Sequence, residues 1–174
     1  MDEQLEREYL EYERQGRIWG NVPRERIRKI KFPRISKHII DQYLLLDDLT
    51  STISDVLDSL GLNGAVPATY LSPLTPGRRL VGTAVTIRSI PIRITPTQSH
   101  LDKEFIRMAT RDLYYLAEAG DVAVADFGGN LEVSNMGGQS CTVARSRGLA
   151  GAIVNGAVRD VNAIRRLDYP VWCR

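Results

Sequence analysis

Cysteine is scarce in this chain of 174 residues, which contains only Cys141 and Cys173. Two cysteines are too few for the disulfide framework of a small secreted domain, and they lack the CxxC or Cys/His spacing of a zinc site. Long apolar runs are also absent, since none approaches the ~18 apolar residues of a membrane span, and the N-terminus is too acidic and polar for a signal peptide. We therefore expect a soluble, cytoplasmic protein without a membrane partner.

Neither sign of charge dominates, because 23 Lys and Arg residues face 21 Asp and Glu residues and leave a net charge of +2. This balance gives no whole-protein field for holding a polyanion, so we expect no nucleic-acid partner. The composition is instead that of a globular protein, with 43% hydrophobic and 25% charged residues. A chain of this length can bury about two-thirds of its unfolded surface in one core.

Residues 1–40 differ from the rest and are expected to form an N-terminal extension before a domain at 41–174. Residues 2–15 place Leu and Tyr among Glu and Arg, which predicts a short amphipathic helix. Residues 24–37 hold seven Lys or Arg against one Glu. This basic arm could contact RNA or an acidic partner. A solvated linker, or a face that pairs with acidic neighbours, is the simpler interpretation, because no aromatic series is interleaved for base stacking.

From about Ile39 onward the pattern is that of an α/β domain. Leu and Ile recur at helical spacing up to Gly61, and later apolar runs of strand length alternate with helical segments. The predicted elements are one or two helices ending near Leu60, a turn at 73–78, strands at 80–89, 121–126, 149–155 and 169–173, and helices at 102–118, 140–148 and 158–167. This alternation predicts a mostly parallel sheet flanked by crossover helices.

Two junctions between elements could carry chemistry, because ligands of open α/β sheets gather beyond the carboxyl ends of the strands. The first junction, NMGGQS at 135–140, is a turn with few side chains that enters a helix. Its backbone N–H groups could bind a carboxylate or a phosphate, although its glycines could equally serve backbone geometry alone. It is not a Walker loop, since no Gly-Lys-Ser/Thr follows.

The second junction, NGAVRD at 155–160, places a guanidinium beside a carboxylate at the start of the next helix. Asp160 could simply cap that helix while Arg159 pairs with it. As a site, Arg159 suits carboxylate recognition, and Asp160 can hold Mg²⁺ largely through water. If parallel strands bring both junctions to one edge, backbone donors would bind a substrate carboxylate and Arg159 would neutralise a developing oxyanion. These groups together suit a 2-oxo acid as substrate and a reaction that forms or protonates an enolate.

Four stretches of the chain carry a resemblance: TISDVLDSLGL (52–62), LTPGRRLVGTAVTI (74–87), GDVAVADFGGN (120–130) and ARSRGLAGAIVNGAVRDVNAIRRLDYPVW (144–172). They resemble the RraA-like family, which includes the regulator of ribonuclease E activity and the class II 4-hydroxy-4-methyl-2-oxoglutarate/4-carboxy-4-hydroxy-2-oxoadipate aldolases. The resemblance implies an α/β, swivelling-type β/α/β domain that assembles as a trimer or hexamer with sites at subunit boundaries.

The resemblance also implies roles for individual residues. It implies that Arg159 contacts the substrate oxygen and that Asp160 holds a divalent metal, Mg²⁺ or alternatively Mn²⁺. The residues implied to bind the substrate carboxylate are Gly137, Gly138, Gln139 and Ser140, together with Arg159. In the ribonuclease regulator the metal-binding Asp is replaced by a non-acidic residue, so Asp160 favours metal chemistry in this chain.

The chain departs from the aldolase pattern at Gly138, where the D-x20-R-D signature has an acidic residue. Asp126 or Glu132 could substitute in space, or they could be a strand-end turn residue and a solvated loop charge. A second departure is the ending at Arg174, since relatives continue past the PVW strand with further C-terminal strands. We expect the remainder of the domain to exist as a separate polypeptide, through cleavage or a split gene, or the chain to be truncated.

These observations predict a metal-dependent lyase that acts on a small 2-oxo acid or a related carboxylate, by aldol cleavage or decarboxylation. The alternative is a non-catalytic regulator that binds an RNA-processing enzyme. Other side chains are weaker candidates. His38 and His100 lie outside both junctions. Cys141, next to the glycine turn, is either a thiol with a pKa lowered by the helix dipole or a small buried residue.

Overall fold

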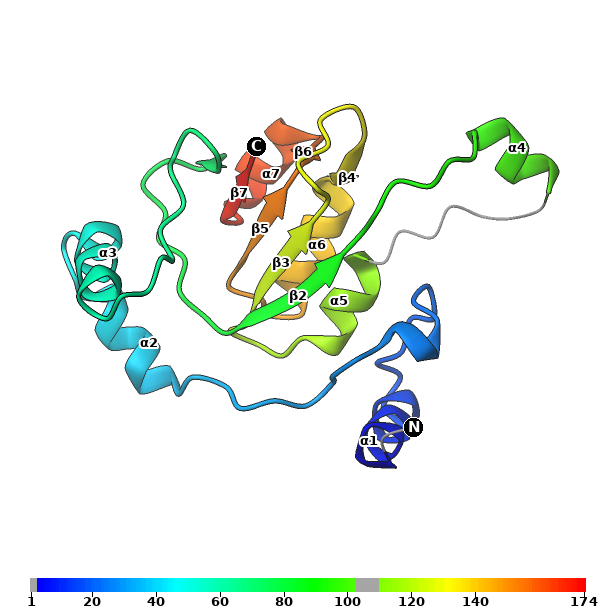
Figure 1. Cartoon of the computed structure of the whole chain (residues 1–174), viewed down its shortest axis with the longest axis horizontal. Coiled ribbons are helices and arrows are strands. Elements are labelled where there is room, and N and C mark those ends of the chain that lie inside the picture. Colours follow the sequence, from blue (N-terminus) through cyan, green and yellow to red (C-terminus); the bar gives the residue numbers. More distant parts are fainter. Residues whose placement is uncertain (1–2, 103–109) are drawn as a thin grey trace.

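A parallel β-sheet forms the centre of the fold in the computed structural model, which describes residues 3–102 and 110–174 (Figure 1). Strand β1 pairs antiparallel with β7 at one edge, and β2 forms the other edge. The remaining pairings, β2 with β3, β3 with β5 and β5 with β7, are all parallel. The strands are β1 (Ser72–Pro73), β2 (Ala84–Arg88), β3 (Val122–Asp126), β5 (Gly151–Asn155) and β7 (Val171–Cys173).

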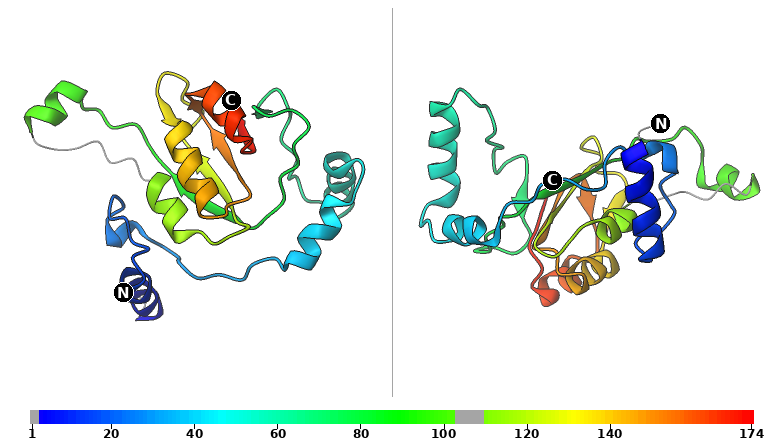
Figure 2. Two further views of the ribbon diagram at one scale, coloured as in Figure 1. Left: turned by 180° about the vertical axis from the view of Figure 1, so that it is seen from behind. Right: turned by 90° about the horizontal axis from the view of Figure 1, so that it is seen from below.

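Three helices cover one face of this sheet, as the view from behind shows (Figure 2). They are α5 (Thr110–Leu116), α6 (Gly138–Ser146) and α7 (Val161–Leu167). Small side chains dominate the buried layer between helices and strands, which allows the two layers to approach closely. The small buried residues of this layer include Ala123, Ala125, Ala152, Cys141 and Ala144. The close packing holds α6 and α7 firmly on the sheet.

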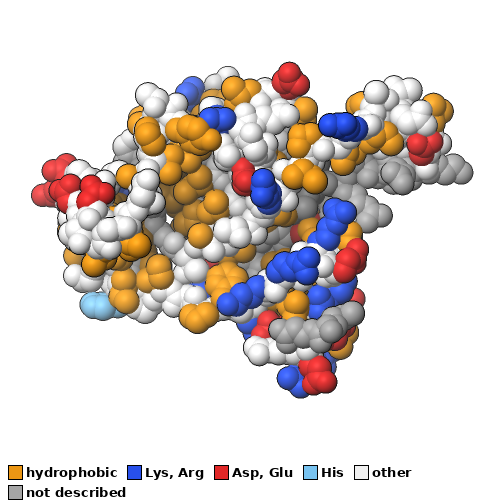
Figure 3. Space-filling model, viewed as in Figure 1, with side chains coloured by type: hydrophobic (Ala, Val, Ile, Leu, Met, Phe, Trp, Pro, Cys, Tyr) orange, Lys and Arg blue, Asp and Glu red, His pale blue; other side chains and the backbone are white. Residues whose placement is uncertain are grey.

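The opposite face of the sheet is only partly covered. The strand register aligns Thr86, Val124, Ile153 and Trp172 in one row across this face, and none of the four is buried. Hydrophobic side chains are visible in the hollow on this side (Figure 3). The hollow has a volume of about 430 Å³ between the sheet and the start of α3 (Leu49–Ser59). Because parallel sheets usually bury both faces, this one retains apolar surface that a further layer could cover.

The N-terminal module, defined here as residues 3–36, has a small core of its own. It contains α1 (Glu3–Arg14) and the 3₁₀ helix η1 (Arg24–Arg26), and its buried side chains are Tyr12, Ile27 and Ile30. Leu116 at the end of α5 packs against this core and joins the module to the sheet domain. The chain then runs through α2 (Lys37–Leu44) to α3, and α4 (Pro96–Leu101) projects from the body (Figure 1).

The predicted α/β class and the mostly parallel sheet are confirmed. Of the helix predicted at 102–118, the structure shows only Thr110–Leu116, because Asp102 follows α4 and residues 103–109 lie outside the described part. The helix predicted at 158–167 begins later, at Val161, because Val158 belongs to a short strand and Asp160 has a left-handed backbone. Within the described residues, none of the helices has the length and apolar character of a membrane span.

Candidate active site

A second, two-stranded sheet brings the two predicted junctions together. Strand β4 (Ser134–Met136) leads into the glycine turn, and β6 (Ala157–Val158) leads into Arg159. The two strands pair in parallel, with Met136 opposite Val158. Neither strand was predicted, because two or three residues carry no hydrophobic period. Their pairing nevertheless places the start of α6 beside the start of α7, as the hypothesis of one site requires.

Asp160 contacts the glycine turn directly. Its Oδ2 accepts a hydrogen bond from the backbone N–H of Gly138 at 3.1 Å. Asp160 has a left-handed backbone, with φ of 60°, and its side chain does not cap α7, the helix that it precedes. It instead satisfies one of the free N–H groups at the start of α6. Asp160 is thus a cap, as the simpler interpretation proposed, but of the other helix.

Gly137 is required by this close approach. A Cβ atom at position 137 would lie 2.7 Å from Oδ2 of Asp160 and 3.0 Å from Cγ of Arg159. Real Cβ atoms essentially never approach another atom as closely as 2.7 Å, so a side chain at position 137 would displace the side chains of Asp160 and Arg159. The glycine therefore serves packing against Arg159 and Asp160 rather than backbone freedom.

Arg159 lies beside Asp160 and remains open to solvent. Its backbone N–H donates to the carbonyl of Met136 at 2.9 Å, which ties it to the end of β4. Its Nε lies 3.8 Å from Oδ2 of Asp160, with the two side chains 73% and 50% exposed. An exposed ion pair at this distance is weak. The guanidinium is therefore available to a ligand at little cost.

A groove of about 740 Å³ runs between α6 and α7 next to these residues. Gly138, Gln139 and Asp160 of the predicted set line it. Three further lining residues, Thr142, Asn162 and Arg166, were not predicted from the sequence. Helical spacing indicates two of them, because Asn162 and Arg166 are four residues apart and therefore share one face of the predicted helix.

The first turn of α6 also offers backbone donors. Gln139 and Ser140 occupy helical positions whose N–H groups have no acceptor within the helix. The positive end of the helix dipole adds to the attraction for an anion at this point. Gly138, Gln139 and Asp160 therefore line the groove, whereas Gly137, Ser140 and Arg159 of the predicted set are neighbours of these residues and do not line it.

Asp126 and Glu132, the two possible substitutes for an acidic residue at 138, make contacts elsewhere. Asp126 accepts hydrogen bonds from Gly128 and Asn155, and these lower the pKa of its carboxyl. The backbone N–H of Glu132 closes a turn onto Asn130. Within residues 3–102 and 110–174, no three His, Cys, Asp or Glu side chains form a cluster able to hold a metal. A metal at Asp160 would thus have at most two such ligands from the described residues.

Cys141 is buried rather than activated. It is fully inaccessible in α6, and burial, followed by the nearby charge of Asp160, raises the pKa of its thiol to about 12. Desolvation therefore outweighs the helix dipole, so the prediction of a lowered pKa is wrong and the small buried residue is correct. At pH 8 only about one thiol in 10⁴ would be ionised.

We accordingly expect Ellman's reagent to leave the native protein unmodified at pH 8. After denaturation in urea, both Cys141 and Cys173 should react, because each is a free thiol that the fold buries. Fast reaction of one thiol in the native protein would show that α6 opens or that the thiol is more acidic than its surroundings predict.

Comparison with known proteins shows which family has this arrangement. The RraA-like family (Aldolase/RraA) matches residues 50–174. Protein DlpA of Legionella pneumophila is 30% identical over 129 residues, which are 74% of this chain and 19% of that protein. A putative 4-hydroxy-4-methyl-2-oxoglutarate aldolase of Halalkalibacterium halodurans is 30% identical over 125 residues, or 72% of this chain and 51% of the relative. The chain thus spans about half the length of that aldolase.

A solved structure supports the same fold. Streptomyces coelicolor RraAS2, described as an unusual member of the RNase ES inhibitor RraA protein family, superimposes with a TM-score of 0.65 at 21% identity. The superposition covers 82% of this chain and 65% of RraAS2. The family thus includes proteins named as aldolases and proteins named as inhibitors of RNA processing. With the family match over 50–174 and the shared fold, the chain belongs to the RraA-like family.

Proposed function

We propose that this protein is a divalent-metal-dependent carbon–carbon lyase that acts on a small 2-oxo acid or a related carboxylate. The observation that carries the proposal is the contact between Asp160 and the N–H of Gly138, 3.1 Å long, beside the exposed guanidinium of Arg159. The carboxylate of Asp160 and the residue Gln139 line one groove, and the guanidinium of Arg159 lies beside Asp160. The relatives named as putative aldolases support this chemistry.

The amides of Gln139 and Ser140 bind the substrate carboxylate in this proposal, because the N–H of Gly138 is already taken by Asp160. Arg159 stands next to this position and carries the negative charge that develops on the neighbouring ketone oxygen. Preorganised donors aimed at such an oxygen commonly contribute a factor of about 10²–10³ to the rate.

The carboxylate of Asp160 fits a hydrated divalent cation. Its Oδ1 makes no hydrogen bond with the described residues, and the side chain is half-exposed. Mg²⁺ commonly binds proteins through one or two carboxylates while keeping several waters. Zinc usually has three or four protein ligands, so a site with few carboxylates suits Mg²⁺ better than zinc. When bound, the ion would supply Lewis-acid polarisation of the substrate oxygen. Mn²⁺ is the alternative.

Decarboxylation requires fewer catalytic groups at this site than aldol cleavage does. When a β-keto acid loses CO₂, the electron pair of the broken C–C bond passes to the ketone oxygen, and the enolate is then protonated by water. The chain needs only to bind the carboxylate and stabilise the oxygen. Aldol cleavage also needs a base for the hydroxyl proton, and Gly138 stands where the aldolase pattern has its acidic residue.

Release of pyruvate from oxaloacetate tests the proposal. We expect purified protein with Mg²⁺ or Mn²⁺ to produce pyruvate faster than the same metal alone, and EDTA to remove the difference. A coupled assay with lactate dehydrogenase measures the rate, and a panel of 4-hydroxy-2-oxo acids extends it to aldol cleavage. If no oxo acid is turned over faster than by free metal, the lyase proposal fails.

The same test separates the alternative function, a non-catalytic regulator of an RNA-processing enzyme. The glycine at 138 and the lack of a three-ligand cluster among the described residues favour that alternative, because they leave the metal with few protein ligands. A regulator should ignore divalent metal and bind its enzyme. In either case we propose a cytoplasmic homo-oligomer, a trimer or hexamer.

A further inference from the structure

The N-terminal module lies outside the family match at 50–174, yet the sheet domain holds it firmly. The guanidinium of Arg17 donates to the carbonyls of Tyr115, Leu116 and Ala117 at 2.8 to 3.0 Å. In the other direction, the buried carboxylate of Asp112 accepts backbone N–H groups of the module, including that of Gly20 at 3.0 Å. The module is thus a fixed part of the surface and not a loose tail.

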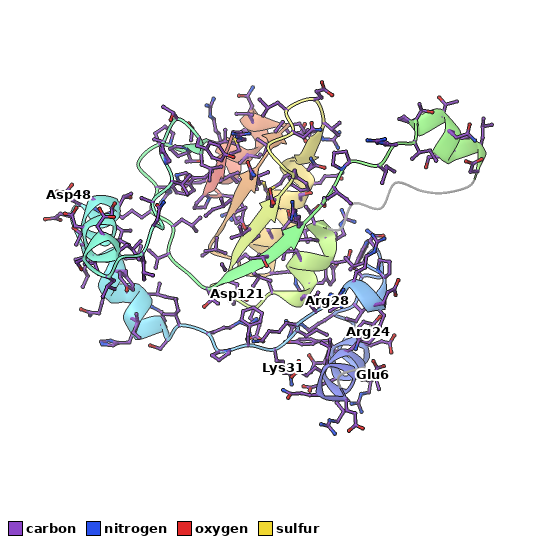
Figure 4. All side chains as sticks on the ribbon, in the orientation of Figure 1. Glu6, Arg24, Arg28, Lys31, Asp48 and Asp121 are labelled. Carbon is purple, nitrogen blue, oxygen red and sulfur yellow. The ribbon has the colours of Figure 1, made fainter. Side chains whose placement is uncertain are left out.

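Four cations of the basic arm form ion pairs within the protein. Arg24 pairs with Glu6 at 2.8 Å (Figure 4), and Lys31 pairs with Glu11 at 2.6 Å. Arg34 pairs with a carboxylate of the sheet domain, and Lys37 pairs with Asp41 of α2. These contacts agree with the simpler interpretation of the arm, a face that pairs with acidic neighbours.

Arg26, Arg28 and Lys29, which we call the cationic patch, behave differently. All three are exposed, and none forms an ion pair with a residue in the described part of the chain. Lys and Arg side chains gather over this part of the module in the space-filling view (Figure 3). Residues 26–29 therefore carry three positive charges that form no ion pair with a carboxylate of residues 3–102 or 110–174.

The backbone beneath the cationic patch is anchored. Ile27 is 8% exposed and Ile30 is 1% exposed, so a buried side chain follows Arg26 and another follows Lys29. The backbone N–H of Lys31 donates to Glu8 of α1 at 3.1 Å. Because the segment is ordered in advance, a partner would lose less conformational entropy on binding than it would with a flexible tail.

Four aromatic rings of the N-terminal module each lie against a cation of the same chain. Each ring has a guanidinium within 5 Å of its centroid, so a cation already occupies one face of each ring, although Trp19 remains 44% exposed. Single-stranded nucleic acids are usually bound by cations together with open aromatic faces. The covered pairs are Arg17 on Tyr12, Arg24 on Tyr9, Arg34 on Phe32 and Arg111 on Trp19.

We propose that the cationic patch docks an acidic polypeptide segment of a partner protein. Side chains of alternate residues in an extended segment lie on one side, about 7 Å apart, so the patch can meet carboxylates at that repeat. Charge complementarity supplies the attraction, and the covered rings disfavour a nucleic acid. The patch is formed by residues outside the proposed active site, so docking is independent of the lyase proposal.

Fluorescence anisotropy with labelled decaglutamate tests the docking surface. We expect the full chain to bind this probe at low salt and to release it in about 0.5 M NaCl, where charges are screened within a few ångströms. The variant Arg26→Gln/Arg28→Gln/Lys29→Gln should bind about tenfold more weakly, since exposed pairs contribute little individually but add together. Its thermal unfolding should be unchanged, because the three side chains are exposed.

A second variant with the same loss of charge is the control. Arg7→Gln/Lys37→Gln/Arg93→Gln removes three exposed cations elsewhere and should bind decaglutamate as the wild type does. Labelled decauridylate tests the nucleic-acid alternative. Failure of the wild type to bind decaglutamate, equal losses in both variants, or tighter binding of decauridylate would each overturn the proposal.

Discussion

Replacing Arg34 with Met is expected to lower the free energy of unfolding by about 3–5 kcal/mol, because a buried carboxylate would lose its charge partner. That carboxylate is Asp121, which is 2% exposed at the start of β3. Arg34 binds it in a bidentate manner, with Nε 3.0 Å from Oδ1 and Nη2 3.0 Å from Oδ2. The Arg34 side chain is itself only 20% exposed, so water screens the pair little. Urea denaturation followed by circular dichroism measures the loss.

Two further variants show whether the buried charge is the cause. Lys37→Met breaks an exposed ion pair with Asp41 and should cost less than about 1 kcal/mol. Combining Arg34→Met with Asp121→Asn should recover part of the lost stability, because the amide can still accept the N–H of Glu118 and leaves no charge buried. A loss below about 1 kcal/mol in Arg34→Met, with no recovery in the double variant, would contradict the explanation.

The pair of Arg34 and Asp121 also shows what the sequence could not predict. The basic arm is visible in the composition of 24–37, but its acidic neighbour is 87 residues away in sequence. Asp121 is the first residue of the strand predicted at 121–126 and gives no local signal of burial. Pairing over such a distance is decided by tertiary packing, which a single sequence without an alignment does not reveal.

Hydrophobic runs predicted most of the sheet, because each long strand is a short apolar segment between turn residues. The strands near 121–126 and 149–155 are observed as Val122–Asp126 and Gly151–Asn155. The strands β4 and β6 escaped prediction although they position the candidate site. Their two or three residues are held by pairing with each other, and neither has a pattern of its own.

The candidate site was predictable in its residues but not in its geometry. Glycines before a helix and an Arg-Asp pair after a strand are local signals, and the structure places them side by side. The sequence could not show that Asp160 has a left-handed backbone and caps α6. That arrangement depends on the close fit of Gly137 against both side chains. It also gives Asp160 two roles, a helix cap and a proposed metal ligand, which can be separated by experiment.

Asp160→Asn is the variant that separates them. An Asn side chain retains an oxygen for the N–H of Gly138 and tolerates a left-handed backbone, so a capping role alone predicts near-normal stability and turnover. The lyase proposal predicts that Asn, which lacks the negative charge, abolishes metal-dependent pyruvate release while the protein remains folded. Asp160→Ala should lose turnover as well and, in addition, about 1 kcal/mol of stability from the lost cap.

Arg159 is expected to show a comparable effect without the structural cost. Its guanidinium is 73% exposed and its backbone makes the contact with β4, so Arg159→Ala should leave thermal unfolding nearly unchanged. We expect kcat/KM for pyruvate formation to fall by about 10²–10³, because the charge that opposes the developing oxyanion is lost. Arg159→Lys should recover only part of kcat/KM, since an ammonium cannot make the two parallel hydrogen bonds of a guanidinium.

Mn²⁺ affinity measured by electron paramagnetic resonance should fall in Asp160→Asn and persist in Arg159→Ala. If both variants keep wild-type turnover, the two residues serve packing alone and the reaction must be sought elsewhere in the protein.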